Sequence, residues 1–271
     1  MQTISFIGAG NVALRFSLAL HEAGYRIETI YNRSENNMGK VVKALQRNGA
    51  NAKSSFSISD TLASSIVIIA VSDNSIAQVV KELERELKES SLDRFPIFLH
   101  TSGATEIDVF APLQQLGAKC GVLYPVMTLN KNKNVEFKDV PLLLESTDCS
   151  IDDILNEMAT RLGSEHYFYT SEQRLKMHIA AVFTCNFVNY VLDLGFSVIG
   201  RDHPLLLPCT LESVRNCFLH NPSAALTGPA KRGDFVTIEK HLELLDKLGM
   251  KEQKEIYSIM TENIMRKRRV Q

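Results

Sequence analysis

Two glycines and an alanine near the N-terminus have the spacing of a turn that binds phosphate. The run Gly8-Ala9-Gly10-Asn11-Val12-Ala13 follows the apolar residues 4–7 and precedes residues with helical periodicity. There the first glycine permits a tight turn, the second lets the backbone approach a pyrophosphate, and the small third residue lets the helix pack on the strand. The amides and dipole at the helix N-terminus attract an anion. We expect this turn to bind a dinucleotide, with contacts from Gly8, Ala9, Gly10, Asn11 and Val12.

The end of the second expected strand, residues 26–31, indicates which dinucleotide is bound. NAD sites usually carry a carboxylate there, which binds the ribose 2′-hydroxyl. This chain instead has Asn32, Arg33 and Ser34. A guanidinium can form charge-assisted hydrogen bonds to a 2′-phosphate, worth about 1.5–3 kcal/mol, and Lys40 in the next helix could assist. We therefore predict NADP(H) as the cofactor, with an ordinary surface arginine as the alternative for Arg33.

Polar residues follow two further expected strands. Val71, Ser72 and Asp73 end the apolar run 65–71, and Ser102 and Gly103 follow the run 97–99. Ligands of doubly wound sheets lie outside such carboxyl ends. We expect the first three residues near the nicotinamide ribose, with a helix cap as the alternative. Ser102 is expected to be a catalytic residue that contacts both cofactor and substrate. Gly103 is expected to bind substrate through its amide, and a strand-ending turn is the alternative for both residues.

Hydride transfer to a carbonyl or imine creates a charge that a proton donor must neutralise. Histidine titrates near neutral pH, and His178 lies in the long helical stretch 171–199, so it is the first candidate for the donor. Asn186 is expected to orient the substrate or polarise its oxygen. Eight helical residues place it about 12 Å from His178 and about 80° around the axis, so the two are not expected to bind one atom. A buried core histidine is the alternative.

A polar, turn-rich segment at residues 227–234 separates two expected helices. Arg232 and Asp234 are expected to contact the substrate, with Arg232 binding its anionic group. Asp234 could also cap the next helix. A loop closed by an Arg–Asp pair explains the same residues without a substrate. No compact metal-ligand spacing occurs among His178, His203, His220 and His241, and no Gly-x-Ser-x-Gly or Walker motif is present. We expect no metal, and the common hydrolase and kinase classes are excluded.

The expected elements that position these residues change character along the chain. Strands alternate with helical stretches in the first half, which predicts an α/β fold with a doubly wound parallel sheet. From about residue 150 onward the pattern is almost entirely helical. We predict an N-terminal dinucleotide-binding domain over residues 1–165 and an all-α domain over residues 166–271. The expected strands are residues 4–7, 26–31, 65–71, 97–99, 120–123, 141–144 and 166–169.

Composition limits the possible partners. The 271 residues are 45% hydrophobic and 23% charged with a formal charge of −1, which excludes a disordered chain and a bulk polyanion binder, so no nucleic acid is expected. Five scattered cysteines argue against a disulfide framework. We see no basic leader and no apolar run of about 20 residues, and expect a cytoplasmic protein without a membrane partner. The nearly all-apolar residues 179–194 predict a helix that is buried in a domain core or a dimer core, and we expect a homodimer.

Four further segments carry a family resemblance. They are 100–103 (His-Thr-Ser-Gly), 123–125 (Leu-Tyr-Pro), 226–234 (Leu-Thr-Gly-Pro running on to Arg-Gly-Asp) and 178–186 (His-x-Ala-Ala-Val-Phe followed by Asn186). With the glycine turn, the chain resembles an uncharacterised family of proposed NADP oxidoreductases, in which a Rossmann-like domain precedes the helical domain of unknown function 2520. It is also similar to pyrroline-5-carboxylate reductase and to deazaflavin-dependent NADP oxidoreductases. Its layout is similar to that of 6-phosphogluconate and β-hydroxyacid dehydrogenases.

This resemblance implies an NADP-dependent oxidoreductase whose small carbonyl, imine or hydroxy substrate reacts in a cleft between the two domains. The β-hydroxyacid dehydrogenases carry a lysine one helical turn before an asparagine, and that spacing is missing around His178 and Asn186. A sensor that binds NADP without turnover therefore stays open. An interaction protein with an empty nucleotide site is the other alternative, and the intact Gly8, Gly10 and Arg33 argue against it.

Overall fold

The computed structural model describes residues 2–129 and 135–270. The chain forms two compact units, Met1–Cys185 and Asn186–Gln271. The division falls 20 residues after the boundary that the sequence predicts at residue 165. Helix α6 (Ser171–Ala181) belongs to the first unit because its buried Arg174 forms an ion pair with Glu145 of the sheet.

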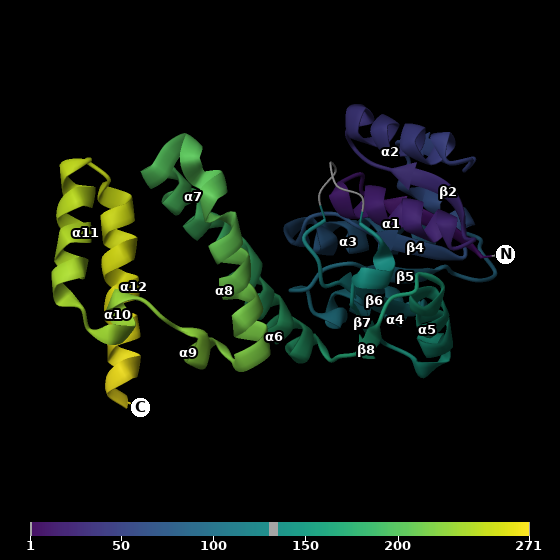
Figure 1. Ribbon diagram of the computed structural model, residues 1–271. Helices are drawn as coiled ribbons and strands as arrows, with labels where there is room; N and C mark the ends of the chain where they lie inside the picture. The colour runs from purple at the N-terminus through teal and green to yellow at the C-terminus, as the bar shows by residue number, and fades with distance from the viewer. Residues whose placement is uncertain (1, 130–134, 271) are drawn as a thin grey trace. The chain divides into compact units, whose positions relative to one another are not determined.

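The first unit is built around an eight-stranded sheet of order β3-β2-β1-β4-β5-β6-β7-β8 (Figure 1). All neighbouring strands are parallel except β6 and β7. The first six strands have the 3-2-1-4-5-6 order of a dinucleotide-binding sheet, so the predicted α/β, doubly wound fold is confirmed. The strands are β1 (Thr3–Ile7), β2 (Arg26–Tyr31), β3 (Lys53–Ser55), β4 (Ile66–Ile69), β5 (Ile97–His100), β6 (Cys120–Pro125), β7 (Leu142–Ser146) and β8 (His166–Phe168).

Two hydrophobic cores lie on opposite faces of this sheet. Ile66 and Ile68 of β4 belong to one core, and Val67 and Ile69 to the other. Because successive strand residues point to opposite faces, β4 is buried on both sides, as its unbroken apolar run predicts. Helices α1 (Asn11–Glu22), α2 (Glu35–Arg47) and α5 (Asp152–Arg161) contribute to the first core, and α3 (Asp73–Glu89) and α4 (Ala111–Gln115) to the second.

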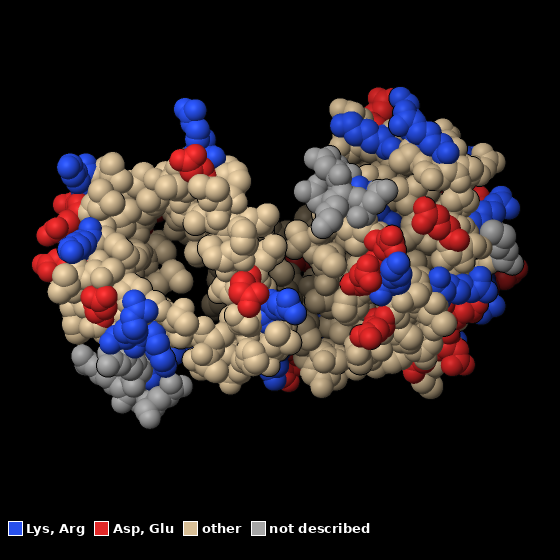
Figure 2. Space-filling view, in the orientation of Figure 1, with Lys and Arg blue, Asp and Glu red and all other residues tan. Residues whose placement is uncertain are grey.

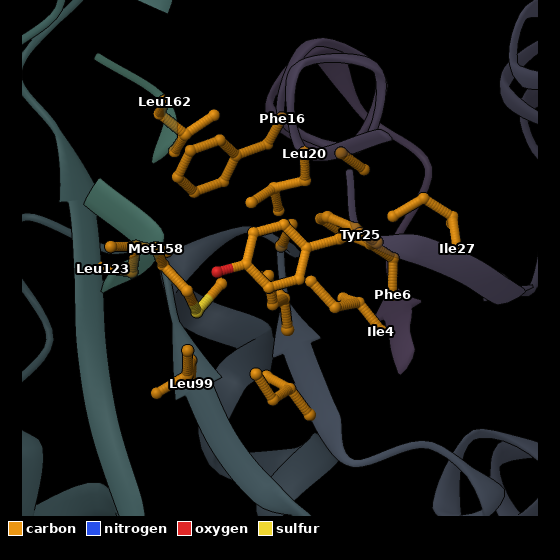
Figure 3. Close-up of a cluster of buried hydrophobic side chains, with 14 of the residues drawn as sticks. Ile4, Phe6, Phe16, Leu20, Tyr25, Ile27, Leu99, Leu123, Met158 and Leu162 are labelled. Atoms are coloured by element: carbon orange, nitrogen blue, oxygen red, sulfur yellow. The ribbon is translucent and has the colours of Figure 1, made fainter. Parts of the chain in front are cut away.

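The first core is drawn in Figure 3 around the ring of Tyr25. That ring lies among Phe6, Phe16 and Met158, which are fully buried. The guanidinium carbon of Arg161 lies 5.3 Å from the ring centroid, a distance at which a cation attracts an aromatic face. The Tyr25 hydroxyl has no hydrogen-bond partner among the described residues, and burial raises its pKa. It therefore stays protonated.

The sheet differs from the sequence expectation at its two ends. The short edge strand β3 contains no large apolar residue, so the apolar pattern does not predict it. At the other end, β7 runs antiparallel to β6, with which its five residues pair from Leu142 to Ser146. An expectation of a purely parallel sheet is wrong here. Among the described residues between β6 and β7, 126–129 and 135–141, the only helical element is the 3-10 turn Phe137–Asp139, whereas parallel pairing requires a long crossover connection, usually an α-helix.

In the second unit, the regular elements of the described residues are all helices, joined by short turns. Helix α6 continues through a π-helical turn, Val182–Asn186, into α7 (Phe187–Ile199). The α-helical spacing assumed between His178 and Asn186 therefore does not hold. A 3-10 helix, Gly200–Leu206, follows. The remaining helices are α8 (Leu207–His220), α9 (Pro222–Ala225), α10 (Pro229–Arg232), α11 (Phe235–Lys247) and α12 (Lys251–Val270).

The helical stretch Ser171–His220 contains one window that is long and apolar enough to cross a membrane, with a mean hydropathy of 1.5 and none of it buried. The expectation that no apolar run reaches this length is therefore corrected. Length and composition alone are weak evidence for a span, because a core helix of a soluble protein has the same properties.

Candidate active site

The turn after β1 has the backbone that its glycines predict. Gly8 has a φ of +113°, and a Cβ there would lie 2.3 Å from the carbonyl oxygen of Ala70, so no other residue fits without a shift. Gly10 is different, because a Cβ there would meet no atom within 4 Å. It is the N-cap of α1 and supplies no side-chain cap. Ala13 is fully buried, which lets α1 pack closely on β1.

A cleft of about 260 Å³ opens above this turn. Its walls come from the carboxyl ends of β1, β2 and β4 and from the first turns of α3. Because α1 has no acidic residue in its first turn, its free N-terminal amides face no competing carboxylate of their own helix. The predicted cofactor residues that line the cleft are Gly8, Ala9, Gly10, Asn32, Arg33, Val71 and Ser72.

Arg33 lies at one end of this cleft and is exposed. Among the described residues its guanidinium has no hydrogen bond or ion pair. Glu82 of α3 lines the same cleft and hydrogen-bonds Tyr31 of β2. Burial and this carboxylate raise the pKa of the Tyr31 hydroxyl. The end of β2 is free of acid, as the sequence shows, but a carboxylate enters from another helix, which the sequence pattern did not reveal.

The remaining predicted cofactor residues flank the cleft. Ser34 is the N-cap of α2, and its carbonyl accepts a hydrogen bond of 3.0 Å from the Asn32 amide. Ser72 is the N-cap of α3 without a side-chain cap bond to the helix, and its hydroxyl lies 2.9 Å from that of Ser75. Asp73 begins α3 and is exposed. Asn11 and Val12 begin α1.

A second group of side chains gathers where β5 and β6 end. The hydroxyl of Tyr124 lies 3.3 Å from Nδ1 of His178, and their rings meet edge to face with centroids 6.1 Å apart. A Cβ on Gly103 would lie 2.7 Å from Cζ of Tyr124 and 2.8 Å from Nδ1 of His178. The two rings thus close over the glycine. The sequence predicts His178 and Gly103 for this site but assigns no role to Tyr124.

Ser102 already has partners in its own loop. Its hydroxyl accepts hydrogen bonds from the amides of Ala104, at 3.1 Å, and Thr105, at 2.9 Å. The side chain is also buried. This geometry is that of a strand-ending turn, one of the two interpretations that the sequence leaves open.

His100 is a structural residue. Its Nδ1 accepts a hydrogen bond of 3.2 Å from the Ser102 amide, and its ring stacks on Phe110 with centroids 5.4 Å apart. Burial, followed by the nearby charge of Arg174, lowers its pKa to about 3. Its Nε2 has no partner among the described residues. His100 is therefore neutral at physiological pH and holds no proton that a substrate could take readily.

Arg174 fixes the helix that carries His178. It is 1% exposed, forms an ion pair with Glu145 of β7 and donates to the carbonyl of Thr105. Ser171 completes the network, because its hydroxyl accepts from the Ile107 amide and donates to Glu145. Arg174 precedes His178 by four residues, so the two lie on one face of α6. The sequence pattern does not predict this anchor, because Glu145 lies 29 residues before Arg174 and no periodicity links the two.

The other predicted substrate residues belong to the second unit. Asn186 ends the π-helical turn and is exposed. Asp234 is the N-cap of α11, where it accepts hydrogen bonds from the amide and the hydroxyl of Thr237 at 3.1 and 2.7 Å. Those bonds lower its pKa, with a smaller contribution from Arg232. The cap expected of Asp234 is confirmed.

Metal ligands do not gather in either unit. Within residues 2–129 and 135–270 no group of three or more His, Cys, Asp or Glu side chains is placed to hold an ion. His241 instead lies 2.8 Å from the hydroxyl of Tyr257.

Comparison with known proteins matches both parts of the chain. Residues 2–125 match the model of the Rossmann-like domain, and residues 140–264 match the domain of unknown function DUF2520. The resemblance seen in the sequence is thus confirmed. No curated protein matches the chain in sequence.

Solved structures similar to this chain extend over nearly its whole length. A proposed NADP oxidoreductase from Bacteroides fragilis is 27% identical, with a TM-score of 0.83 and 98% of both chains covered. An imine reductase from Streptomyces aurantiacus is 15% identical, with a TM-score of 0.65, over 95% of this chain and 92% of that one. A pyrroline-5-carboxylate reductase from Coxiella burnetii is 16% identical, with a TM-score of 0.57 and 98% of both chains covered. At these last two identities the likeness establishes the fold.

Proposed function

We propose that this chain, which joins a Rossmann-like domain to a DUF2520 domain, is an NADP-dependent oxidoreductase. Its reaction transfers a hydride between NADP(H) and a small carbonyl, imine or hydroxy compound. The Bacteroides protein of similar structure is named for the same cofactor, and the imine and pyrroline-5-carboxylate reductases share the fold. These likenesses support the reaction class but name no substrate.

The observation that carries the proposal is the open face of Gly10 beside an exposed arginine. A Cβ on Gly10 would project into unoccupied space within the cleft, so the glycine is not required by the protein's own packing. It is required if a pyrophosphate lies against the backbone there. Arg33 lines the same cleft, and its guanidinium would bind the 2′-phosphate of NADP in this proposal.

The chemistry divides between cofactor and protein. Bound NADPH supplies the hydride. The protein's part is to hold the nucleotide through the α1 amides and Arg33, and to provide a proton for the substrate heteroatom. His178 is the proton source in this proposal, because it is the half-buried histidine held at the carboxyl edge of the sheet by Arg174. Neutral, buried His100 does not compete for that role.

The cofactor assignment is tested by titrating the protein with NADPH and with NADH while nucleotide fluorescence is followed. Arg33→Ala should weaken NADPH binding by about 1.5–3 kcal/mol, or roughly ten- to a hundredfold. NADH lacks the 2′-phosphate, so its affinity should not change. If neither nucleotide binds at millimolar concentration, the oxidoreductase proposal fails.

A sensor that binds NADPH without turnover is the second candidate. The engagement of Ser102 by two amides of its own loop favours it, because a hydroxyl so engaged is less available to a substrate. The two candidates are separated by assaying the wild type with keto acids, cyclic imines and hydroxy acids. The protein is an enzyme if one of these compounds is turned over and if His178→Ala loses that turnover but still binds NADPH.

We also propose that a second copy of the chain covers the helical unit. On α8, Leu207, Leu211, Val214 and Phe218 follow one another at helical spacing and are 59%, 60%, 46% and 86% exposed. Few charged side chains cover α7 and α8 in the view of Figure 2. A stripe of this kind marks a face that another helix buries. In a cytoplasmic homodimer, the helices of a second copy of the chain would bury this face.

The dimer is tested by light scattering on the full chain. Wild type should have twice the mass of one chain, and Leu211→Glu should convert it to monomers or aggregates. Flotation with phospholipid vesicles tests the opposing interpretation. If the protein is monomeric and floats with the vesicles, a membrane surface rather than a second copy covers the apolar face of α8.

A further inference from the structure

Tyr124 occupies a position that the reaction proposed above leaves unassigned. It lies near the end of β6, is half-buried, and presents its hydroxyl 3.3 Å from Nδ1 of His178. Its partner comes from α6, 54 residues further along the chain. Strand β6 and helix α6 both belong to the first unit, so the pair is part of one compact structure.

Three contacts hold the two rings in this arrangement. The ring of Tyr124 packs edge to face on that of His178, at an interplanar angle of 72°. Both rings close over Gly103, where even one methyl group would lie within 2.8 Å of them. Arg174, one turn before His178, anchors α6 to Glu145. The hydroxyl–imidazole pair is thus fixed from the strand side, the loop side and the helix side.

The surroundings keep the Tyr124 hydroxyl protonated. Burial raises its pKa most, and the charges of Asp73 and Cys185 raise it further, while Arg174 acts in the opposite direction. The sheet topology locates the pair. Strand β6 lies two strands from β4 and parallel to it, so the carboxyl end of β6, with Tyr124, lies at the same edge of the sheet as the nucleotide cleft.

We propose that Tyr124 is the catalytic residue that passes the proton to the substrate, with His178 behind it as the source. In the reducing direction, the substrate carbon accepts the hydride of the reduced nicotinamide, and its oxygen or nitrogen takes the proton of the Tyr124 hydroxyl. The Nδ1 proton of the His178 imidazolium moves to the phenolic oxygen in the same step. His178 is left neutral and regains a proton from solvent. This inference rests on the proposed function.

The neighbouring polar groups do not offer an alternative donor. His100 is neutral and fully buried, and Ser102 is 6% exposed, so both are less accessible to a substrate than half-buried Tyr124. Burial raises the pKa of Tyr124, so a phenolate left there after proton transfer is unfavourable. Transfer of the Nδ1 proton of His178 in the same step avoids that phenolate.

The kinetic test compares Tyr124→Phe, His178→Ala and the control Tyr167→Phe, which alters an exposed tyrosine of β8. Loss of a general acid should lower kcat by about 10²–10⁴-fold in the first two variants. KM and the NADPH dissociation constant should stay within threefold of wild type. Tyr124→Phe with at least a third of wild-type kcat would overturn the inference, even if His178→Ala were inactive.

A second readout needs no substrate. In ¹⁵N correlation spectra of the imidazole rings, Tyr124→Phe should shift the Nδ1 resonance of His178, and Tyr167→Phe should not. An unchanged resonance would show that the pair does not form in solution and would refute the relay. If the pair is present but the wild type reduces no carbonyl or imine, the proposed function fails and the relay fails with it. If Tyr124→Phe turns over substrate at the wild-type rate, the relay is refuted and the proposed function stands.

Discussion

The two units of the chain bury their apolar residues to different extents. The first has two continuous cores on either side of a sheet, with residues such as Phe6, Phe16 and Phe98 fully buried. In the second unit, Phe218 is 86% exposed and Leu205 79% exposed. A sheet covered by helices satisfies its own apolar faces. The helices of the second unit lack such a sheet and leave large apolar residues exposed, so its apolar burial is incomplete by comparison.

The largest expected effect tests the incomplete unit. Phe218→Glu places a charge on the exposed stripe of α8, where burial in a dimer would desolvate it. The wild-type dimer should disappear in light scattering at micromolar concentration. Leu92→Glu alters a residue of the first unit that is 40% exposed and should leave the dimer intact. If Phe218→Glu remains dimeric, α8 does not form the interface.

The next effect tests the anchor of the complete unit. Arg174→Ala removes a fully buried cation and leaves Glu145, which is 15% exposed, without its partner. Breaking a buried pair in this way should lower the free energy of unfolding by about 3–5 kcal/mol, measured by urea denaturation. Lys176→Ala breaks an ion pair that is 71% and 77% exposed and should change stability within experimental error. Equal effects of the two variants would contradict the anchor.

A smaller loss is expected at the turn after β1. Gly8→Ala places a Cβ at positive φ and 2.3 Å from the Ala70 carbonyl oxygen, and strain of this kind costs about 1–3 kcal/mol. Gly39→Ala in α2, where a Cβ meets no atom within 4 Å, should not destabilise the protein. Thermal unfolding of both variants measures the difference. A Gly8→Ala protein as stable as wild type would mean that the β1–β4 approach is looser than described.

The smallest effect concerns pH. Because the pKa of His100 falls from 6.5 to about 3 on folding, the neutral form stabilises the fold above pH 6.5. That contribution is lost as the pH falls below 6.5 towards 3. Between pH 7 and 5.5 wild type should lose about 1 kcal/mol more stability than His100→Asn. Urea denaturation at the two pH values measures this, and parallel losses in both proteins would rule it out.

What could be predicted from the sequence was mostly local. The turn at Gly8 follows from glycine spacing next to an apolar strand, and the burial of β4 follows from its unbroken apolar run. The Tyr124–His178 contact joins residues 54 apart, and the Arg174–Glu145 pair joins residues 29 apart. Neither has a periodicity that reveals its partner, because strand order and helix docking decide which residues meet.

The contacts that individual side chains make within the site could not be predicted from the sequence for the same reason. Glu82 reaches the cleft from α3. It is far in sequence from the end of β2, Tyr31, where the acid of an NAD site usually lies. The hydroxyl of Ser102 could have faced a ligand or its own loop, and the fold of that loop selected the latter. The sequence predicts Gly103 as an amide donor to substrate, and the structure adds that its missing Cβ makes room for the rings of Tyr124 and His178.

The central claim is that the Gly10 backbone is kept open for a dinucleotide. It is tested most directly by titrating NADPH into wild type, Gly10→Ala and Gly39→Ala, with thermal unfolding of each protein measured without nucleotide. The account predicts equal unfolding temperatures for wild type and Gly10→Ala, and at least tenfold weaker NADPH binding in Gly10→Ala alone. Wild-type affinity in Gly10→Ala would contradict it.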